Sequence, residues 1–343
     1  MRGRTVADLW GGFADLADTQ PWRRDTLVNV FSAGKGVLAM LALDCVEAGE
    51  LALDAPVATL WPALAAAGKE RLTLRMLLAH RAGLPAVREP LPEHAMYDWQ
   101  RMCEALAAER PYWEPDADHG YHVNTWGFLV GELLRRATGA PIERLLAQRL
   151  GAALGADFQL GVAASDQPRI ADVALPAPSP ASGAQLVAAF PPTGDAERDA
   201  MIRSTYFNPP GLSGFGTVNT RAWREAVIPS TNAHANARGL ARAYAWFLGR
   251  SATLRAEATS THSEGEDRVL GRPSRFGLGF QLPRATRSLG PSPHAFGHFG
   301  HGGSLGLADP DAGLAFAYVT SRPGARFRSP RTDRLLAALY ACL

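Results

Sequence analysis

Ser32 and Lys35 stand three residues apart at the start of an apolar segment. Side chains with this spacing lie on one face of a helix, so the hydroxyl and the amine are within reach of each other. A serine hydroxyl needs an adjacent proton acceptor to become a good nucleophile, and a lysine serves if burial and neighbouring cations lower its pKa. The free N–H groups at a helix start would also stabilise negative charge on an acyl carbonyl. The pair therefore predicts acyl transfer through a serine nucleophile.

The spacing alone leaves a structural role open. Serine is a common helix N-cap, and the lysine of such a pair is usually solvated. Here the surrounding sequence is FSAGKGVLAML, which belongs in a core, and burying a lysine without partners is costly. This apolar setting favours a functional Lys35.

Tyr121 lies in the segment Gly120–Asn124, after the polar loop WEPDADHG and before an amphipathic segment. A phenol between cationic or hydrogen-bonding groups can relay a proton between the serine and the leaving group. A half-buried tyrosine that anchors a loop is an equally good interpretation of this segment alone.

A glycine-rich run, GHFGHGGS at 297–304, directly precedes a predicted strand, and glycine lets a backbone approach a ligand closely. No helix is predicted after it, so an edge strand lining a cleft fits better than a phosphate-binding loop. His298 and His301 lack a third ligand at a natural spacing, which argues against a metal site.

The elements that would position these residues alternate between strand and helix patterns. Strands are expected at Thr5–Gly12, Phe276–Leu282, Gly303–Ala308 and Gly313–Ser321. Helices are expected from Ser32 to Gly49, repeatedly between Leu51 and Gly161, at Asn236–Leu248 and after Ser329. Residues 173–192, rich in Pro, Ala and Ser, predict a loop.

This order predicts an α+β fold. Residues 1–30 and 270–343 would form an antiparallel sheet flanked by helices, and residues 31–269 a mainly helical lobe. The active site would lie in the cleft between the two lobes.

Composition excludes several classes of function. The 343 residues are 47% hydrophobic, enough for a large core, and 35 basic against 33 acidic residues give a net charge of +2 without a basic stripe for nucleic acid. Cys45, Cys103 and Cys342 are odd in number and far apart, so reduced thiols are expected. No apolar stretch follows the first residues, so we expect no signal peptide, no membrane anchor and a cytoplasmic protein.

Taken together and in this order, the three segments resemble the class C β-lactamases and family VIII carboxylesterases, which are related to penicillin-binding proteins. In these serine hydrolases, S-x-x-K, Tyr and K/H-x-G elements converge in one cleft. The resemblance covers nearly the whole chain and includes DLWGGFAD, TLVNVFSAGKG, LTLRMLLAHRAGLP, GYH to LVGELLRRATG, IPSTNAHANARGLA and GHFGHGGSLGLADPDAGLAFAYV. It implies the β-lactamase/penicillin-binding-protein-like fold and no cofactor.

Carried over residue by residue, the resemblance implies Ser32 as nucleophile, Lys35 as base and Tyr121 as proton relay. His298 and Gly300 match the third motif, and the backbone N–H groups of Ser32 and His301 would form the oxyanion hole. Candidates to line the acyl or alcohol pocket are Asn124, Asn219, Trp223, Asn232, His234 and Asn236. A plain capping role for Asn232 is equally compatible with its position.

Three departures from the family pattern bear on these expectations. β-Lactamases of this group have Tyr-x-Asn, whereas Val123 follows Tyr121 by two and the asparagine is Asn124. His298 replaces a lysine, which lessens the permanent positive charge available to a substrate carboxylate. Both changes favour a neutral ester over a β-lactam. The family usually has a helix and a strand ahead of TVADLWGG, so either the start lies further upstream or the sheet has an exposed edge.

The sequence therefore predicts hydrolysis of short-chain carboxylic esters through an acyl-enzyme on Ser32. A β-lactamase, a D-Ala-D-Ala peptidase or an acyltransferase could use the same site. A non-catalytic binding or self-assembling module is the alternative outside catalysis, and the intact motifs argue against it. The expected partner is a small-molecule ester or β-lactam-like substrate, with no nucleic acid and no membrane, and homo-oligomerisation is left open.

Overall fold

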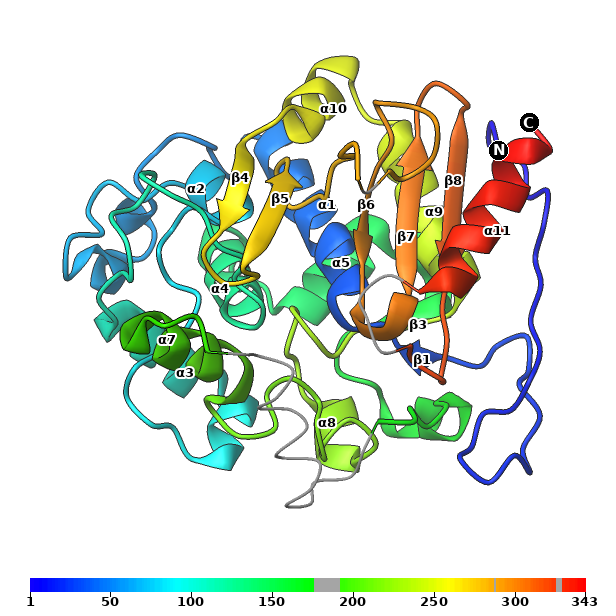
Figure 1. Ribbon diagram of the computed structural model, residues 1–343, viewed down its shortest axis with the longest axis horizontal. Helices are drawn as coiled ribbons and strands as arrows, with labels where there is room; N and C mark the ends of the chain where they lie inside the picture. Colours follow the sequence, from blue (N-terminus) through cyan, green and yellow to red (C-terminus); the bar gives the residue numbers. More distant parts are fainter. Residues whose placement is uncertain (176–191, 287, 325–328) are drawn as a thin grey trace.

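A helix buried on all sides follows the predicted nucleophile. The computed structural model describes residues 1–175, 192–286, 288–324 and 329–343. A 3₁₀ turn at Phe31–Ala33 leads directly into α1 (Gly34–Glu47), whose residues are buried as far as Cys45. A helix that is apolar on every face has to be enclosed by other elements. The expected helix is confirmed, and α1 runs through the middle of the molecule (Figure 1).

An antiparallel sheet lies against α1. Its strands are β4 (Ser263–Asp267), β5 (Arg272–Phe276), β6 (Phe296–Phe299), β7 (Leu305–Asp309) and β8 (Leu314–Tyr318). The first two form a hairpin, the last three pair in the order β6-β7-β8, and isolated bridges through Gln281 join the two groups. The strands predicted near 303–308 and 313–321 correspond to β7 and β8.

Helices cover both faces of this sheet (Figure 1). Neighbouring residues of a strand point to opposite faces. Accordingly Leu307 of β7 packs with Leu336 of α11 (Pro330–Ala341), while Gly306 faces α9 (Ala237–Leu248). The helices expected at 236–248 and after Ser329 are therefore confirmed.

The rest of the described chain is mainly helical. Further helices are α2 (Leu74–Leu78), α3 (Trp99–Ala108), α4 (Thr125–Thr138), α5 (Ile142–Leu154), α7 (Ala196–Phe207), α8 (Arg221–Glu225) and α10 (Ala252–Thr259). A small antiparallel sheet has the order β1 (Val28–Asn29), β3 (His234–Ala235), β2 (Phe158–Gln159). The predicted α+β class is confirmed, whereas the division into lobes at residues 30 and 270 stays a prediction.

Most of the loop predicted at residues 173–192 lies outside the described residues. Within the described ranges, no helix combines the length and apolarity needed to cross a bilayer.

Two strand predictions are wrong. Thr5–Gly12 forms no strand and lies on the surface with Leu9 89% exposed, because β-branched and aromatic residues make a strand only where a partner strand is available. Phe276–Leu282 turns back on itself instead of extending. Gly279 has a φ of +79°, and a Cβ there would come 2.4 Å from Cβ of Ala39 in α1, so this segment is a tight turn packed on the helix.

Glycines set the distance between α1, α9 and the sheet. A Cβ at Gly36 of α1 would come 2.2 Å from the hydroxyl oxygen of Tyr244 in α9, and a Cβ at Gly306 of β7 would come 2.2 Å from its Cε2 atom. Tyr244 is fully buried between them. The tyrosine therefore fits only because both of its neighbours lack a side chain.

Gly306→Ala should destabilise the protein, because either Tyr244 or the strand has to move. We expect the free energy of unfolding to fall by about 1–3 kcal/mol in chemical denaturation. The matched control is Gly151→Ala in α5, where no atom lies within 4 Å of the added Cβ and the backbone is helical. That variant should be neutral or more stable by about 0.5–1 kcal/mol. Equal midpoints for Gly306→Ala and the wild type would contradict this account of the packing.

Candidate active site

Ser32 and Lys35 are in direct contact at the start of α1. Lys35 Nζ lies 3.1 Å from Ser32 Oγ and donates to the backbone oxygens of Val123 at 2.6 Å and Ser230 at 2.9 Å. A neutral amine has two N–H groups and one lone pair. An ammonium would donate to Ser32 Oγ as well, whereas in the neutral form both N–H groups can bond to the carbonyls and the lone pair is left for the serine hydroxyl.

Burial favours the neutral form of the amine that this geometry needs. Lys35 is 0% exposed, and burial holds the pKa of its amine well below the usual lysine value, because the charged form loses hydration. Neighbouring cations, which the sequence argument also allowed for, are not required. Lys35 is therefore able to accept the proton of Ser32.

Tyr121 completes a cluster with this pair. Its ring is stacked on Phe276 with centroids 5.7 Å apart, and Lys35 Nζ lies 5.1 Å from the Tyr121 centroid. Burial raises the pKa of Tyr121 well above its usual range, and the neighbouring Ser32 hydroxyl lowers it by less. The phenol is thus protonated at neutral pH. Because it lies beside Ser32, the predicted nucleophile, it can act as a proton donor.

A buried carboxylate fixes the backbone of Tyr121. Asp267, at the end of β4 and 0% exposed, accepts hydrogen bonds from the N–H groups of Tyr121 at 3.0 Å, Val269 at 2.9 Å and Leu270 at 2.8 Å. It also accepts from Ser274 Oγ at 2.9 Å. With this many donors Asp267 is fully satisfied, and it ties the predicted proton relay to the β4–β5 hairpin.

The glycine-rich run packs directly on the turn that carries Ser32. A Cβ at Gly300 would come 2.1 Å from the backbone oxygen of Val30, so only glycine permits this approach. On the other side, Phe31 has a φ of +50°, a left-handed conformation that costs energy outside glycine and is found at functional sites. The nucleophile is therefore held in a strained turn wedged against the end of β6.

The two histidines of this run lie on either side of Gly300. His298 is fully buried in β6, with its ring centroid 5.9 Å from that of Tyr121 and Nδ1 2.8 Å from the Phe299 backbone oxygen. His301 makes edge contacts with Phe31 and Phe215, and burial lowers the pKa of its imidazole. The oxyanion hole of Ser32 and His301 stays a prediction.

The polar candidates for substrate binding have structural contacts. Asn124 donates to the Thr205 backbone oxygen at 2.8 Å and to Ser213 Oγ at 2.9 Å. Asn232 accepts from the Ile228 N–H at 2.8 Å and donates to the backbone oxygens of Trp223 and Ala226, so it staples its own loop, as the capping interpretation expects.

The remaining candidates for substrate binding are also buried or bonded to other parts of the fold. Asn219 pairs with the backbone of Val173, Trp223 donates to Asn29, and Asn236 caps α9. His234 is fully buried in β3, and burial, with a smaller effect of Arg224, lowers its pKa to about 3. A role for these side chains in binding substrate stays a prediction.

Sequence reasoning missed the groups that orient Lys35 and Tyr121. The acceptors from Val123 and Ser230 are backbone carbonyls, which have no residue-type signature. Asp267 lies 146 residues from Tyr121, in a charged stretch next to Glu266 and Arg268. Only its burial and its donors, which the sequence does not display, distinguish it from a surface aspartate.

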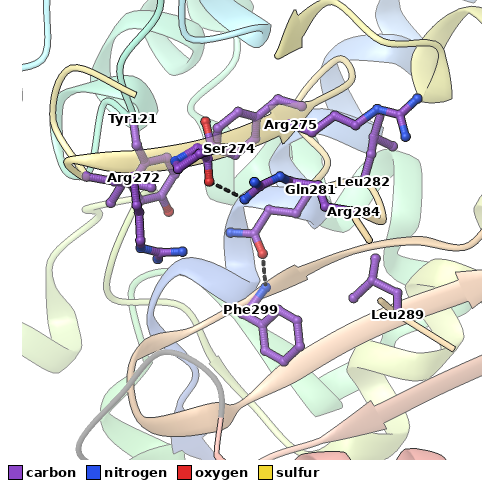
Figure 2. A pocket seen from close by; sticks show the side chains of 12 residues that line it. Tyr121, Arg272, Ser274, Arg275, Gln281, Leu282, Arg284, Leu289 and Phe299 are labelled. Atoms are coloured by element: carbon purple, nitrogen blue, oxygen red, sulfur yellow. Dashed lines mark hydrogen bonds between the residues drawn. The ribbon is translucent and has the colours of Figure 1, made fainter. Parts of the chain in front are cut away.

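A pocket opens beside Tyr121 (Figure 2). It encloses about 530 Å³, counting its open mouth, between β5, the segment after Phe276 and the end of β6. Gln281 crosses it and accepts a hydrogen bond from the Phe299 N–H at 3.3 Å. Part of this volume is open solvent, so the pocket is a partly open hollow beside the phenol.

The chain is similar to known proteins over nearly its whole length. Residues 1–340 match the family model Beta-lactamase, and the chain belongs to this family. It is an enzyme of the serine hydrolase class.

Among its relatives is the Esterase/beta-lactamase LipL of Mycobacterium tuberculosis, 35% identical over 94% of this chain and 75% of that protein. A family VIII carboxylesterase structure superposes with a TM-score of 0.89 and 35% identity, covering 100% of this chain and 90% of that one. A penicillin-binding protein homologue from Caulobacter crescentus gives a TM-score of 0.85 and 33% identity, covering 97% and 88%. The predicted family, fold and enzyme class are confirmed.

The low pKa of Lys35 predicts how reactivity depends on pH. The amine is a base only when neutral, so the rate at which a fluorophosphonate labels Ser32 should rise with pH and reach a plateau well below the ordinary lysine pKa of about 10.4. The raised pKa of Tyr121 keeps the phenol protonated across that plateau. Labelling rates from about pH 5 to about pH 10 test this. Lys35→Arg, always protonated, should stay slow throughout, and a wild-type midpoint near the ordinary lysine value would refute the assignment.

Asp267→Asn should slow the reaction through Tyr121. The amide keeps the shape of the carboxylate but loses charge and one acceptor, so the backbone of Tyr121 is held less firmly, and we expect labelling of Ser32 to slow about tenfold. The control is Glu264→Gln on the same strand, an exposed residue paired only with Arg275. Rates are compared on samples shown by circular dichroism to be folded. An Asp267→Asn protein that is folded and labels at the wild-type rate would exclude this positioning role.

Proposed function

We propose that this enzyme hydrolyses carboxylic esters through an acyl-enzyme on Ser32. The observation that carries the proposal is the contact between Ser32 Oγ and a fully buried Lys35 whose amine is also bonded to the Val123 and Ser230 carbonyls. When its N–H groups are bonded to the carbonyls, the neutral amine can accept a proton only from the serine hydroxyl.

The reaction follows from these positions. Lys35 takes the proton of Ser32 as Oγ bonds to the ester carbonyl, and the oxyanion is stabilised by the backbone N–H groups of Ser32 and His301. As the carbon–oxygen bond to the alcohol breaks, Tyr121 gives its proton to the leaving oxygen and regains one from the Lys35 ammonium. Water then attacks the acyl-enzyme by the same groups in reverse order and releases the acid.

Several observations support an ester over a β-lactam. His298 and Val123 occupy the positions where β-lactamases of this type have lysine and asparagine, and His298 is fully buried beside Tyr121. The similar proteins LipL and Esterase EstB of Burkholderia gladioli, the second 32% identical over 41% of this chain, are named as esterases. Cytoplasmic location and homo-oligomerisation stay predictions from the sequence.

Acyl transfer to an alcohol is the second candidate. Ser32 is only 5% exposed, so water has limited access to an acyl group bound there. The chain is also 31% identical, over 39% of its length, to the Monacolin J acid methylbutanoyltransferase of Aspergillus terreus. An acyl-enzyme that water reaches slowly would persist until an alcohol attacks it, and the enzyme would then act as a transferase.

A panel of short-chain esters, with a chromogenic cephalosporin beside it, tests the proposal. Wild-type protein should hydrolyse the esters, and Ser32→Ala should lose more than roughly 10³-fold in kcat/KM together with all fluorophosphonate labelling. The alanine protein should still fold, which circular dichroism checks, although Lys35 loses its contact with the hydroxyl. Rapid cephalosporin turnover without esterase activity would reverse the choice of substrate, and folded wild-type protein that takes no label would favour the binding module.

A further inference from the structure

The pocket beside Tyr121 carries an arginine on the same face of β5 as Phe276. Residues two apart in a strand point to one face, so Arg272, Ser274 and Phe276 share a face. Phe276 stacks on Tyr121, and both line the pocket with Arg272. The guanidinium of Arg272 therefore lies on the side of the hairpin where the proposed reaction takes place.

The guanidinium of Arg272 lacks a carboxylate partner among the residues that the structure describes. Its register partner across the hairpin is Asp267, but that carboxylate is occupied by the backbone N–H groups of Tyr121, Val269 and Leu270. Among the ion pairs of the described residues, none includes Arg272. A half-buried arginine without an anion is able to bind one from outside.

Arg284 contributes a second unmatched charge from the opposite wall. Its guanidinium donates to the backbone oxygen of Pro273, as Figure 2 shows, and within the described ranges it forms no ion pair. Arg275 also lines the pocket, but it differs in being 3.6 Å from Glu264 and donating to Thr261 Oγ1 at 2.7 Å. The pocket thus combines two uncompensated arginines with an apolar floor that includes Phe276.

We propose that this pocket binds a carboxylate on the alcohol side of the ester. The inference rests on the proposed function, in which Tyr121 protonates the leaving oxygen, so the alcohol part of the substrate lies next to Tyr121 and enters the pocket. The planar, two-pronged guanidinium matches a carboxylate in shape and charge. His298, in place of a lysine, lessens the permanent positive charge near Ser32. The arginines of the hairpin restore it on the leaving-group side.

Two aryl acetates distinguish this from a pocket for neutral alcohols. Para-acetoxybenzoate and para-acetoxybenzamide share the acyl group, size and ring, and differ in the charge of the para substituent. Wild-type enzyme should prefer the benzoate through a lower KM, and added salt should erode that preference because the arginines are partly exposed. The quantity measured is the ratio of kcat/KM for benzoate over benzamide.

Arg272→Gln and Arg284→Gln should each lower this ratio about tenfold, as expected for loss of a charge-assisted hydrogen bond. Arg272→Lys and Arg284→Lys should recover part of it. The matched control is Arg268→Gln, which removes the same charge from the turn between β4 and β5, at an arginine that pairs with Asp118 and does not line the pocket, and which should leave the ratio as in the wild type.

The outcomes separate the two proposals. If folded enzyme hydrolyses neither acetate nor any ester of the panel, the proposed function fails and this inference with it. If both acetates are hydrolysed but the ratio is near one, or does not respond to Arg272→Gln and Arg284→Gln, the esterase stands and the carboxylate pocket is wrong.

Discussion

The structure depends on an amine kept out of water. A lysine with no exposed surface is tolerated only if its hydrogen-bonding groups are satisfied and its charge is given up. Lys35 meets both conditions through Ser32 and two backbone carbonyls that lie 88 and 195 residues away in the sequence. Three distant parts of the chain thus have to meet at one nitrogen atom, and the same requirement creates the base that the nucleophile needs.

The surrounding polar groups hold these segments of the chain in place around Lys35 Nζ. Ser230, which offers its carbonyl to Lys35, is held by its own hydroxyl, which accepts from the Gly127 N–H at 2.6 Å. The loop before it is stapled by Asn232, whose amide is bonded to backbone groups at both ends. A Cβ on Gly34 would come 2.7 Å from Cβ of Ala233, so the loop and α1 are in closest contact here. Asn232 therefore contributes to the site indirectly, because it holds the loop whose Ser230 carbonyl accepts from Lys35.

The residues with reactive side chains could be predicted from the sequence, but the groups that hold them in position could not. Ser32, Lys35 and Tyr121 were identified because a nucleophile, a base and a phenol have recognisable residue types. Their orientation comes from Asp267 and from two carbonyls, which a sequence does not distinguish from any others. The wrong strand at Thr5–Gly12 has a similar cause, since propensity describes a residue and not the partner strand it needs. The helices were predicted well because their pattern is local, whereas the turn at Gly279 reflects contact with α1.

The cations that could bind a substrate lie apart from the groups that are proposed to carry out the reaction. Around Ser32 the groups that could carry a positive charge are buried, which favours their neutral forms. Burial, with further effects of His122 and Lys35, holds the pKa of His80 well below its usual value, and burial lowers that of His122 to about 4. A permanent cation in this interior would remain next to Lys35 without hydration, at a high cost. Cations are instead found at the rim, on the β4–β5 hairpin and the segment after it, where water reaches them. A substrate anion can therefore be attracted there without disturbing the neutral amine on which the proposed reaction depends.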